Sequence, residues 1–356
     1  MNRIARNCVW PSAILVLLFA IRGFAVEPGK PSRTAVLTLA ARAVGSREPD
    51  PAIRNPDWVA ERLLGPDELA LLGPDNVLRK ALDDDYLQAM KNFAVAVPVA
   101  HFLVRTRFID DSLQQAVSAG AMQVVILGAG FDSRAYRFRQ LLKHVRVFEL
   151  DYGPTQEYKK RRVLEVLGAP PSNLVYTPID FTRQNLGEVL RRAGYQRHRK
   201  TFFLWEGVTM YIPEDAVRAT LQFVAHNSAP GSSIVFDHLS STAVDVAQAT
   251  ESRRRVLDRL RENGEPQIFG LPDGTEQAFV SGLGLNLVTH VFAISGDTLK
   301  YLKRRDGTLL GGMHLPLLTA GNEVPRPLAL RLAGEGIGWL ALAVVAETTG
   351  ARKTKK

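Results

Sequence analysis

VVILGAGFDSR, residues Val124 to Arg134, is an apolar run that leads directly into a glycine turn. Gly128 and Gly130 allow the backbone to turn tightly and to bring a ligand against the main chain at the start of the following helix. A dinucleotide-binding turn carries a third glycine, for packing beside a pyrophosphate, where this chain has Ser133. The turn therefore favours a ligand without phosphates over NAD. An ordinary strand–helix turn without a ligand is the other interpretation.

Short apolar runs alternate with helical segments on the C-terminal side of this turn. Because such alternation is typical of parallel strands joined by crossover helices, we expect an α/β sheet. The predicted strands are Val124–Leu127, Val145–Leu150, Leu174–Ile179, Thr201–Trp205 and Ser233–Phe236, and later Leu287–Ala293 and Ile337–Ala346. A helix is expected at Asp297–Lys303, and the Gly- and Pro-rich segment Gly307–Pro327 reads as a long loop.

Helices are predicted before the sheet. Ser32-Arg33-Thr34 is a helix-start signature. Residues 50–120 are expected to form further helices, with breaks at Pro56, Gly65-Pro66 and Gly73-Pro74. The last of these helices carries Phe93 to Phe108 and has Pro98 inside it. We interpret residues 31–120 as a helical cap.

Carboxylates follow the ends of several predicted strands. Glu149 and Asp151 lie about 20 residues past the glycines, where an acid binds the two ribose hydroxyls of an adenosine. Because side chains alternate along a strand, these two point the same way. Asp180-Phe181 and Glu206-Gly207 follow the third and fourth strands. The sequence therefore predicts a ligand site at the carboxyl edge of the sheet, although any single acid could be a surface carboxylate.

These stretches belong to a set that extends over nearly the whole chain after residue 30. The set comprises Ser32–Ala35, Val104–Phe108, Leu127–Arg134, Val147–Asp151, Ile179–Phe181, Glu206–Pro213, Gly264–Pro266 and Tyr301-Leu302. In this combination the chain resembles the leucine carboxyl methyltransferase superfamily, particularly its bacterial branch of S-adenosylmethionine-dependent methyltransferases. The resemblance implies a Rossmann-like class I methyltransferase fold, with a mostly parallel seven-stranded sheet and an N-terminal helical cap.

The resemblance also implies roles for individual residues in binding S-adenosylmethionine. For the methionine part of the cofactor, Arg105 would pair with the carboxylate and Glu206 would lie near the amino group. For the adenosine part, Asp151 rather than Glu149 would bind the ribose, and Asp180 and Phe181 would contact the adenine. Gly128 and Gly130 would form the glycine turn, and Arg33 would belong to a motif that closes over the cofactor. Phe181 stands where many relatives carry leucine, and few relatives begin with an apolar stretch like residues 8–21.

The expected reaction is transfer of a methyl group to an oxygen of a small molecule. A carboxylate acceptor is nucleophilic without losing a proton, whereas a hydroxyl needs a general base, for which Tyr211 and His238 are the candidates. We expect Tyr211 to serve more as a pocket wall and His238 as a structural residue. The net charge of +9 favours an anionic acceptor and hence a carboxylate.

Rival functions are a nicotinamide-dependent reductase and a non-catalytic or membrane-tethered binding protein with a methyltransferase fold. Ser133 and the lack of a Tyr-x-x-x-Lys pair after the fourth strand disfavour the reductase. Loss of the reaction would leave damaged cofactor positions, and none of the matched positions is damaged.

Composition limits the remaining partners. A single cysteine, Cys8, excludes an intrachain disulfide and a cysteine-based metal cluster, and we expect no metal. The basic runs carry no nucleic-acid motif and are interpreted as solvated helix faces.

The first thirty residues form an apolar extension that leaves localisation open. Arg3 and Arg6 precede an apolar run over residues 8–21, which is short for a membrane span. It fits a cleaved signal, an anchor or an extension without export role. We expect a cytoplasmic enzyme, in which only this run could contact a membrane. The methyltransferase domain is expected over residues 121–349 and a basic tail over residues 350–356.

Overall fold

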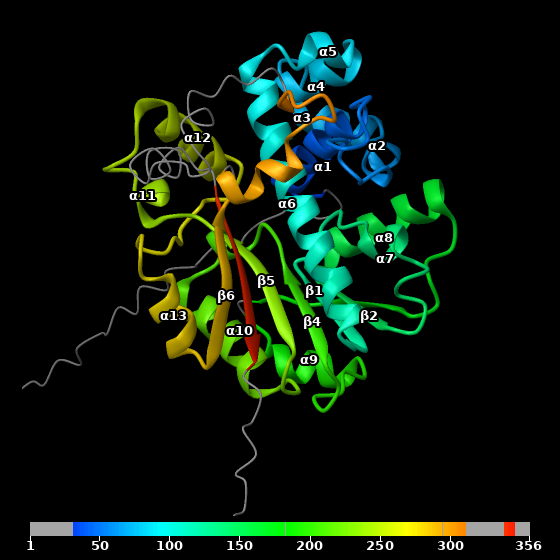
Figure 1. Cartoon of the computed structure of the whole chain (residues 1–356), viewed down its shortest axis with the longest axis vertical. Coiled ribbons are helices and arrows are strands. Elements are labelled where there is room, and N and C mark those ends of the chain that lie inside the picture. Colours follow the sequence, from blue (N-terminus) through cyan, green and yellow to red (C-terminus); the bar gives the residue numbers. More distant parts are fainter. Residues whose placement is uncertain (1–30, 182, 294, 311–337, 346–356) are drawn as a thin grey trace, which may run out of the picture.

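The computed structural model describes residues 31–181, 183–293, 295–310 and 338–345 (Figure 1). Seven strands form one sheet in the order β3-β2-β1-β4-β5-β7-β6. Neighbouring strands from β3 to β5 run parallel, and β7 pairs antiparallel with both β5 and β6. The predicted Rossmann-like, mostly parallel seven-stranded sheet is therefore confirmed.

The strand bounds differ from the prediction by at most a few residues. The strands are β1 Gln123–Leu127, β2 Arg146–Asp151, β3 Leu174–Pro178, β4 Thr201–Trp205, β5 Ser233–His238, β6 Leu285–Phe292 and β7 Trp339–Val345. Within β6 the pairing register shifts between Leu287 and Thr289. Asp237 and His238 thus belong to β5, and β6 begins before the predicted Leu287.

Apolar runs become strands here because both faces of the sheet are covered. Val125 and Leu127 of β1 pack in one core with Leu221 of α10. Val124 and Ile126 point to the opposite face and pack with Ile109 and Leu113 of α6. All five residues of β1 and of β4 are buried.

Helices flank the sheet and precede it. They are α1 Arg33–Ser46, α2 Val59–Leu63, α3 Pro66–Leu72, α4 Val77–Asp83, α5 Tyr86–Ala89, α6 Phe93–Ser118, α7 Arg134–Arg137, α8 Gly153–Leu167, α9 Leu186–Arg192, α10 Glu214–His226, α11 Ser241–Val244, α12 Glu251–Glu262 and α13 Glu276–Gly282, with the 3-10 helices η1 Thr209–Tyr211 and η2 Gly296–Tyr301. The Ser32 hydroxyl caps α1 by accepting from the amide of Ala35. The last cap helix continues past Phe108 to Ser118, with Pro98 inside it.

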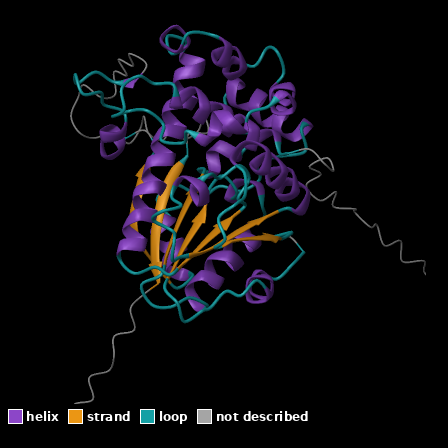
Figure 2. Cartoon of the chain, turned by 90° about the vertical axis from the view of Figure 1, so that its right-hand side faces the viewer, coloured by secondary structure: helices purple, strands orange, loops and turns teal. Residues whose placement is uncertain are grey.

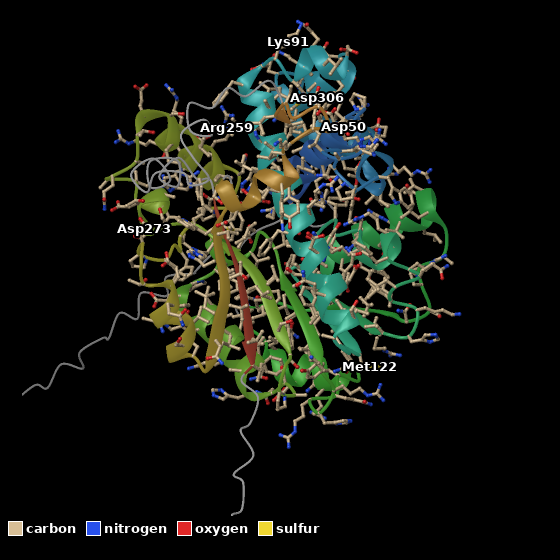
Figure 3. The ribbon with its side chains drawn as sticks, in the orientation of Figure 1. Asp50, Lys91, Met122, Arg259, Asp273 and Asp306 are labelled. Carbon is tan, nitrogen blue, oxygen red and sulfur yellow. The ribbon has the colours of Figure 1, made fainter. Side chains whose placement is uncertain are left out.

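The helices α1 to α5 gather above one edge of the sheet, and α6 runs from them down along the sheet (Figures 1 and 2). Met122, which precedes β1, lies at one end of the molecule, and Lys91 and Asp306 lie at the other end with these helices (Figure 3). The carboxyl ends of the parallel strands therefore face the helices, and α6 packs along β4 and β5.

Some predictions fall partly outside the described ranges. The predicted helix Asp297–Lys303 is η2, a 3-10 helix. The predicted loop Gly307–Pro327 is described only to residue 310, and the apolar run 8–21 and the basic tail lie outside the described residues. In the part of the chain that is described, no helix is both long and apolar enough to span a membrane.

Candidate active site

A cavity of about 760 Å³ lies between the carboxyl edge of the sheet and the helices above it. Seven of the eight predicted cofactor residues line it: Arg105, Gly128, Gly130, Asp151, Asp180, Phe181 and Glu206. Ligand pockets of proteins span about 300–1,000 Å³, so this cavity has room for a cofactor and a second small molecule.

The glycine turn after β1 fixes the position of Asp151. Gly128 has a φ of +66°, and a Cβ there would lie 2.3 Å from a methyl carbon of Val208. Gly130 has a φ of +43°, and its amide donates to Oδ2 of Asp151. The amide of Tyr152 donates to Oδ1 at 2.6 Å. The carboxylate is thereby held at the cavity wall.

Glu149, two residues earlier on β2, has a different role from Asp151. It is fully buried, and its Oε2 lies 2.6 Å from Nζ of Lys159. Burial raises the pKa of Glu149 to about 7, although the ammonium of Lys159 acts in the opposite direction. Of the two acids, Asp151 lines the cavity and Glu149 serves as a structural ion pair under α8.

Arg105 joins α6 to the ends of β4 and β5. Its Nε lies 3.0 Å from Oε1 of Glu206, and its Nη1 donates to Oδ2 of Asp237 at 2.8 Å. The guanidinium also lies over the ring of Phe102, 4.6 Å from the ring centre. Asp237 further accepts from the amide of Gly207 at 2.6 Å. These contacts orient the planar fork of Arg105 at the cavity wall.

A second arginine holds Glu206 from behind. Nη1 of Arg134 lies 2.8 Å from Oε2 of Glu206, and the same guanidinium pairs with Asp132 and Asp110. Burial raises the pKa of Glu206, but the charges of Arg105 and Arg134 outweigh this effect and hold the pKa well below its ordinary value. Glu206 is therefore an anion at neutral pH.

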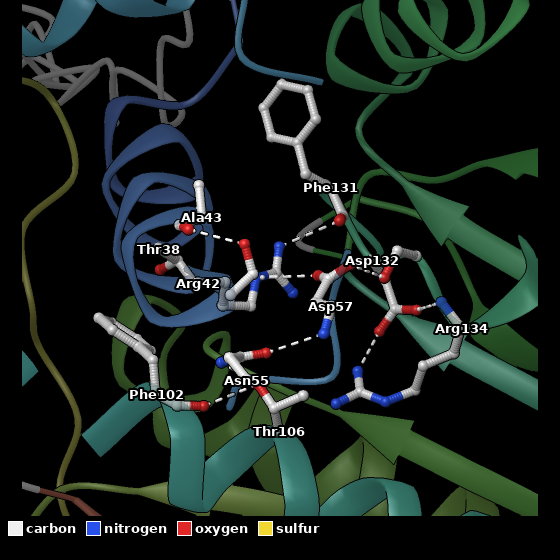
Figure 4. A network of polar contacts seen from close by, with 12 residues as sticks. Thr38, Arg42, Ala43, Asn55, Asp57, Phe102, Thr106, Phe131, Asp132 and Arg134 are labelled. Carbon is white, nitrogen blue, oxygen red and sulfur yellow. Dashed lines mark hydrogen bonds and ion pairs between the residues drawn. The ribbon is translucent and has the colours of Figure 1, made fainter. Parts of the chain in front are cut away.

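The network extends to the cap helices (Figure 4). Arg42 of α1 donates to the carbonyl oxygen of Phe131 at 3.0 Å and lies 3.3 Å from Asp57. Arg137 pairs with Asp110 and donates to the hydroxyl of Ser133. The sequence analysis assigned no role to these charged residues, because their partners lie in distant segments.

The charges that line the cavity differ in sign from the net charge of the chain. Among the described lining residues, the carboxylates outnumber the arginines six to three. The acids are Asp132, Asp151, Asp180, Glu206, Asp237 and Glu265, and the arginines are Arg42, Arg105 and Arg183. The cavity wall therefore carries more acidic than basic side chains, whereas the net charge of +9 comes from residues elsewhere.

Arg33 is the one predicted cofactor residue that does not line the cavity. Its Nη1 donates to Oδ1 of Asn263 at 3.2 Å on the surface. The backbone amides of Arg33 and Thr34 each donate to Glu265 at 3.0 Å. The Ser32–Ala35 and Gly264–Pro266 motifs thus meet at the start of α1, and Glu265 supplies a negative charge at the positive end of that helix.

The two candidate bases lie in different places. Tyr211 lines the cavity, and its hydroxyl accepts from Nε2 of Gln267 at 3.3 Å. His238 is not among the lining residues: its Nδ1 lies 3.1 Å from the carbonyl oxygen of Leu239, and its Nε2 lies 3.0 Å from Nε2 of His290.

The His238–His290 contact is a hydrogen bond between neutral rings. The planes of the two rings differ by only 7°. Their centres are 5.2 Å apart, whereas the two Nε2 atoms are 3.0 Å apart. The difference is about the width of one ring, so the rings meet edge to edge with the two nitrogens facing each other. Burial is the main cause that lowers the pKa of His238 to about 3. His238, Glu276 and His290 each bring one possible ligand atom within 4.8 Å of the others, a grouping that resembles a metal site. A hydrogen bond between the two rings requires that one Nε2 carries a proton and the other accepts it.

His101 is a cavity residue that the sequence analysis missed. It lies one helical turn before Arg105 on α6, so both side chains share a face of the helix. Among the described residues, its Nδ1 is buried without a hydrogen-bond partner. The i, i+4 spacing to Arg105 was the available signal, but it is common in helices and indicates no function by itself.

Comparisons with known proteins place the chain in a family. The sequence model described as leucine carboxyl methyltransferase matches residues 35–225. A Mycobacterium marinum protein named "Putative S-adenosyl-L-methionine-dependent methyltransferase" is 31% identical over 321 residues, which cover 89% of this chain and 91% of that protein. YktD of Bacillus subtilis, named in the same way, is 26% identical and covers 77% of this chain and 93% of its own.

A solved structure described as a "putative methyltransferase" from Thermobifida fusca is 15% identical, covers 90% of this chain and 96% of its own, and has a TM-score of 0.46. The family model and the mycobacterial relative each match more than half of the chain. The chain therefore belongs to the leucine carboxyl methyltransferase family of S-adenosylmethionine-dependent methyltransferases.

Proposed function

We propose that this enzyme transfers the methyl group of S-adenosylmethionine to an oxygen, of a carboxylate or a hydroxyl, on a small molecule. The observation that carries the proposal is a single cavity of about 760 Å³ that joins the cofactor residues to a wall of apolar side chains from α6, η1 and α12. When bound, S-adenosylmethionine supplies an electrophilic methyl group on a positively charged sulfur. A cavity of about 760 Å³ has room for a small acceptor beside the cofactor, but not for a folded protein or a nucleic-acid duplex.

The residues of the cavity fit this cofactor. Asp151, held by two backbone amides, would accept hydrogen bonds from the ribose hydroxyls. Asp180 and Phe181 would contact the adenine, and the excess of carboxylates suits a ligand with sulfonium and ammonium groups. Glu206 would bind the ammonium group.

Arg105 would bind the methionine carboxylate through the edge of its guanidinium, while Glu206 and Asp237 hold the group in place. Arg33 would act through its backbone, by anchoring the start of α1 to Glu265. The main contribution of the protein to the rate is then to hold the acceptor oxygen in line with the methyl group.

Two measurements test the proposal. Calorimetric titration of the full chain should show binding of S-adenosylhomocysteine, the demethylated cofactor, and no binding of NADH. Incubation with methyl-labelled cofactor and a metabolite extract should place the label on a small product. Release of labelled methanol in mild alkali would identify a methyl ester, and alkali-stable label would identify an ether. Label in nucleic acid would contradict the proposal.

A further inference from the structure

The cavity has two parts that differ in chemistry. Gly130, Asp151 and Asp180 lie at the ends of β1, β2 and β3, on one half of the sheet. His101 lies over the other half, because its Cε1 is 3.9 Å from the position of a Cβ on Gly338, the residue before β7. We call the part around His101 the acceptor chamber; Val97 and Phe102 of α6 and Leu239, which also approaches Gly338, line the cavity there.

Among the described residues of the acceptor chamber polar groups are few, and the His101 side chain makes no hydrogen bond to them. Tyr211 and Gln267 also line the cavity, but they bond to each other, and Gln267 accepts from Arg253. In contrast, neither ring nitrogen of His101 has a partner among the described residues; Nδ1 is buried, whereas Nε2 is accessible and is the nitrogen that a ligand in the cavity can reach. A ligand that supplies a partner to Nε2 gains affinity.

The ring of His101 is neutral at physiological pH. Burial, followed by the nearby charge of Arg105, lowers its pKa to about 3. A neutral imidazole has one donor and one acceptor nitrogen, and it does not attract a carboxylate as an imidazolium would. The arginines that line the cavity are each paired with an acid: Arg42 with Asp57, Arg105 with Glu206 and Asp237, and Arg183 with Asp180.

We propose that the acceptor is an uncharged, apolar molecule that presents a hydroxyl group, of the phenol class, and that His101 binds this hydroxyl and takes its proton. The proposal rests on the methyltransferase function above and narrows the acceptor from any oxygen to a hydroxyl. It replaces the preference for a carboxylate, which was based on the lack of a confident general base in the sequence and on the net charge of the whole chain.

The methyl group moves from sulfur to oxygen with no change of oxidation state in the protein. A lone pair of the hydroxyl oxygen forms the new bond to the methyl carbon, and the carbon–sulfur bond breaks with its electron pair on the sulfur. The hydroxyl proton moves to His101 and then to solvent, and the products are a methyl ether and a neutral thioether. Because its ring is neutral, His101 can accept this proton, and the hydroxyl becomes more acidic as the carbon–oxygen bond forms.

The test uses two probes of similar shape, 2-naphthol and 2-naphthoate, at near-neutral pH. The full chain saturated with S-adenosylhomocysteine is titrated with each probe. We expect 2-naphthol to bind at least about tenfold more tightly than 2-naphthoate. His101→Phe should weaken the binding of 2-naphthol by about tenfold or more, whereas His101→Gln, which retains a hydrogen-bonding group, should weaken it less. His226→Gln, at an exposed position on α10, is the matched control.

The failures can be distinguished. Loss of S-adenosylhomocysteine binding in the unmodified chain would contradict the proposed function itself. If that ligand binds, equal or tighter binding of 2-naphthoate, binding of neither probe, or unchanged binding of 2-naphthol to His101→Phe would each overturn the acceptor proposal. Methyl transfer provides a second readout: labelled cofactor should give an alkali-stable ether of 2-naphthol, at a rate that falls in His101→Phe and less in His101→Gln.

Discussion

Glu265 accepts hydrogen bonds from the backbone amides of Arg33 and Thr34, 3.0 Å each, and so joins the segment after α12 to the first turn of α1. The two segments are more than 200 residues apart in the chain. Both Thr34 and Glu265 line the cavity. The contact therefore closes one side of the site and satisfies two amides that a helix leaves without internal partners.

Replacement of Glu265 should loosen this side of the cavity. Glu265→Ala removes two charge-assisted hydrogen bonds, so we expect the free energy of unfolding to fall by about 1–3 kcal/mol. Glu265→Gln should lose less, because its carbonyl oxygen still accepts. Urea titration measures the stability, and hydrogen exchange should become faster in the first turns of α1. Glu262→Ala, at an exposed position on α12, is the control, and an equal loss in both alanine variants would contradict the assignment.

Asp151→Asn should weaken binding of S-adenosylhomocysteine by about 1.5–3 kcal/mol, the usual contribution of a hydrogen bond to a charged group. The amide nitrogen of asparagine cannot accept, and one of the two backbone amides that now hold Asp151 would lose its partner. Calorimetry checks the affinity, with Asp215→Asn at an exposed site of α10 as the matched control. Unchanged affinity in Asp151→Asn would exclude Asp151 as the ribose ligand.

Lys159→Met should destabilise the fold strongly without changing the cavity wall. It leaves Glu149 buried without its partner, and loss of one member of a buried ion pair costs about 3–5 kcal/mol. Adding Glu149→Met to Lys159→Met removes the uncompensated charge and should recover much of the loss. Lys160→Met, which breaks a partly exposed pair with Glu157, should change stability little. The free energy of unfolding, measured in urea, compares the variants. A double variant no more stable than Lys159→Met would contradict the role of Lys159 in neutralising Glu149.

Stability should fall in acid because of His238. Its folded pKa of about 3 lies below the ordinary value of 6.5, so the unfolded chain binds the proton first as the pH decreases. The contribution to stability is complete above pH 6.5 and is lost as the pH falls from 6.5 toward 3. A histidine that is protonated in the unfolded chain but not in the folded one makes the free energy of unfolding fall by about 1.4 kcal/mol for each pH unit in this window.

His238→Gln removes one titrating ring, so its stability should depend less steeply on pH over this window than that of the unmodified chain. The free energy of unfolding, measured in urea at several pH values, gives both slopes. His226→Gln again serves as the control, because His226 is exposed. Parallel slopes for the unmodified chain and His238→Gln would show that His238 is protonated in the folded state.

Local sequence patterns determined the elements and the edge at which the site lies. The run of apolar residues before Gly128 predicts a buried strand, and the carboxylates after three further strands predict polar groups at one edge, because parallel strands end together. Both predictions depend on neighbours within a few residues along the chain. Secondary structure and side-chain alternation are local properties, so they can be read without knowing what packs against them.

Only the tertiary structure decided which of these side chains face the cavity and with which charge. Glu149 and Asp151 have the same place in the alternation along β2, yet Lys159 of α8 holds Glu149 in a buried pair while Asp151 lines the cavity. His101 gained its position from the approach of Gly338, more than 200 residues later. The net charge of +9 did not predict an acidic cavity, because it sums over the whole surface, whereas the cavity is governed by the few charges that folding brings to its wall.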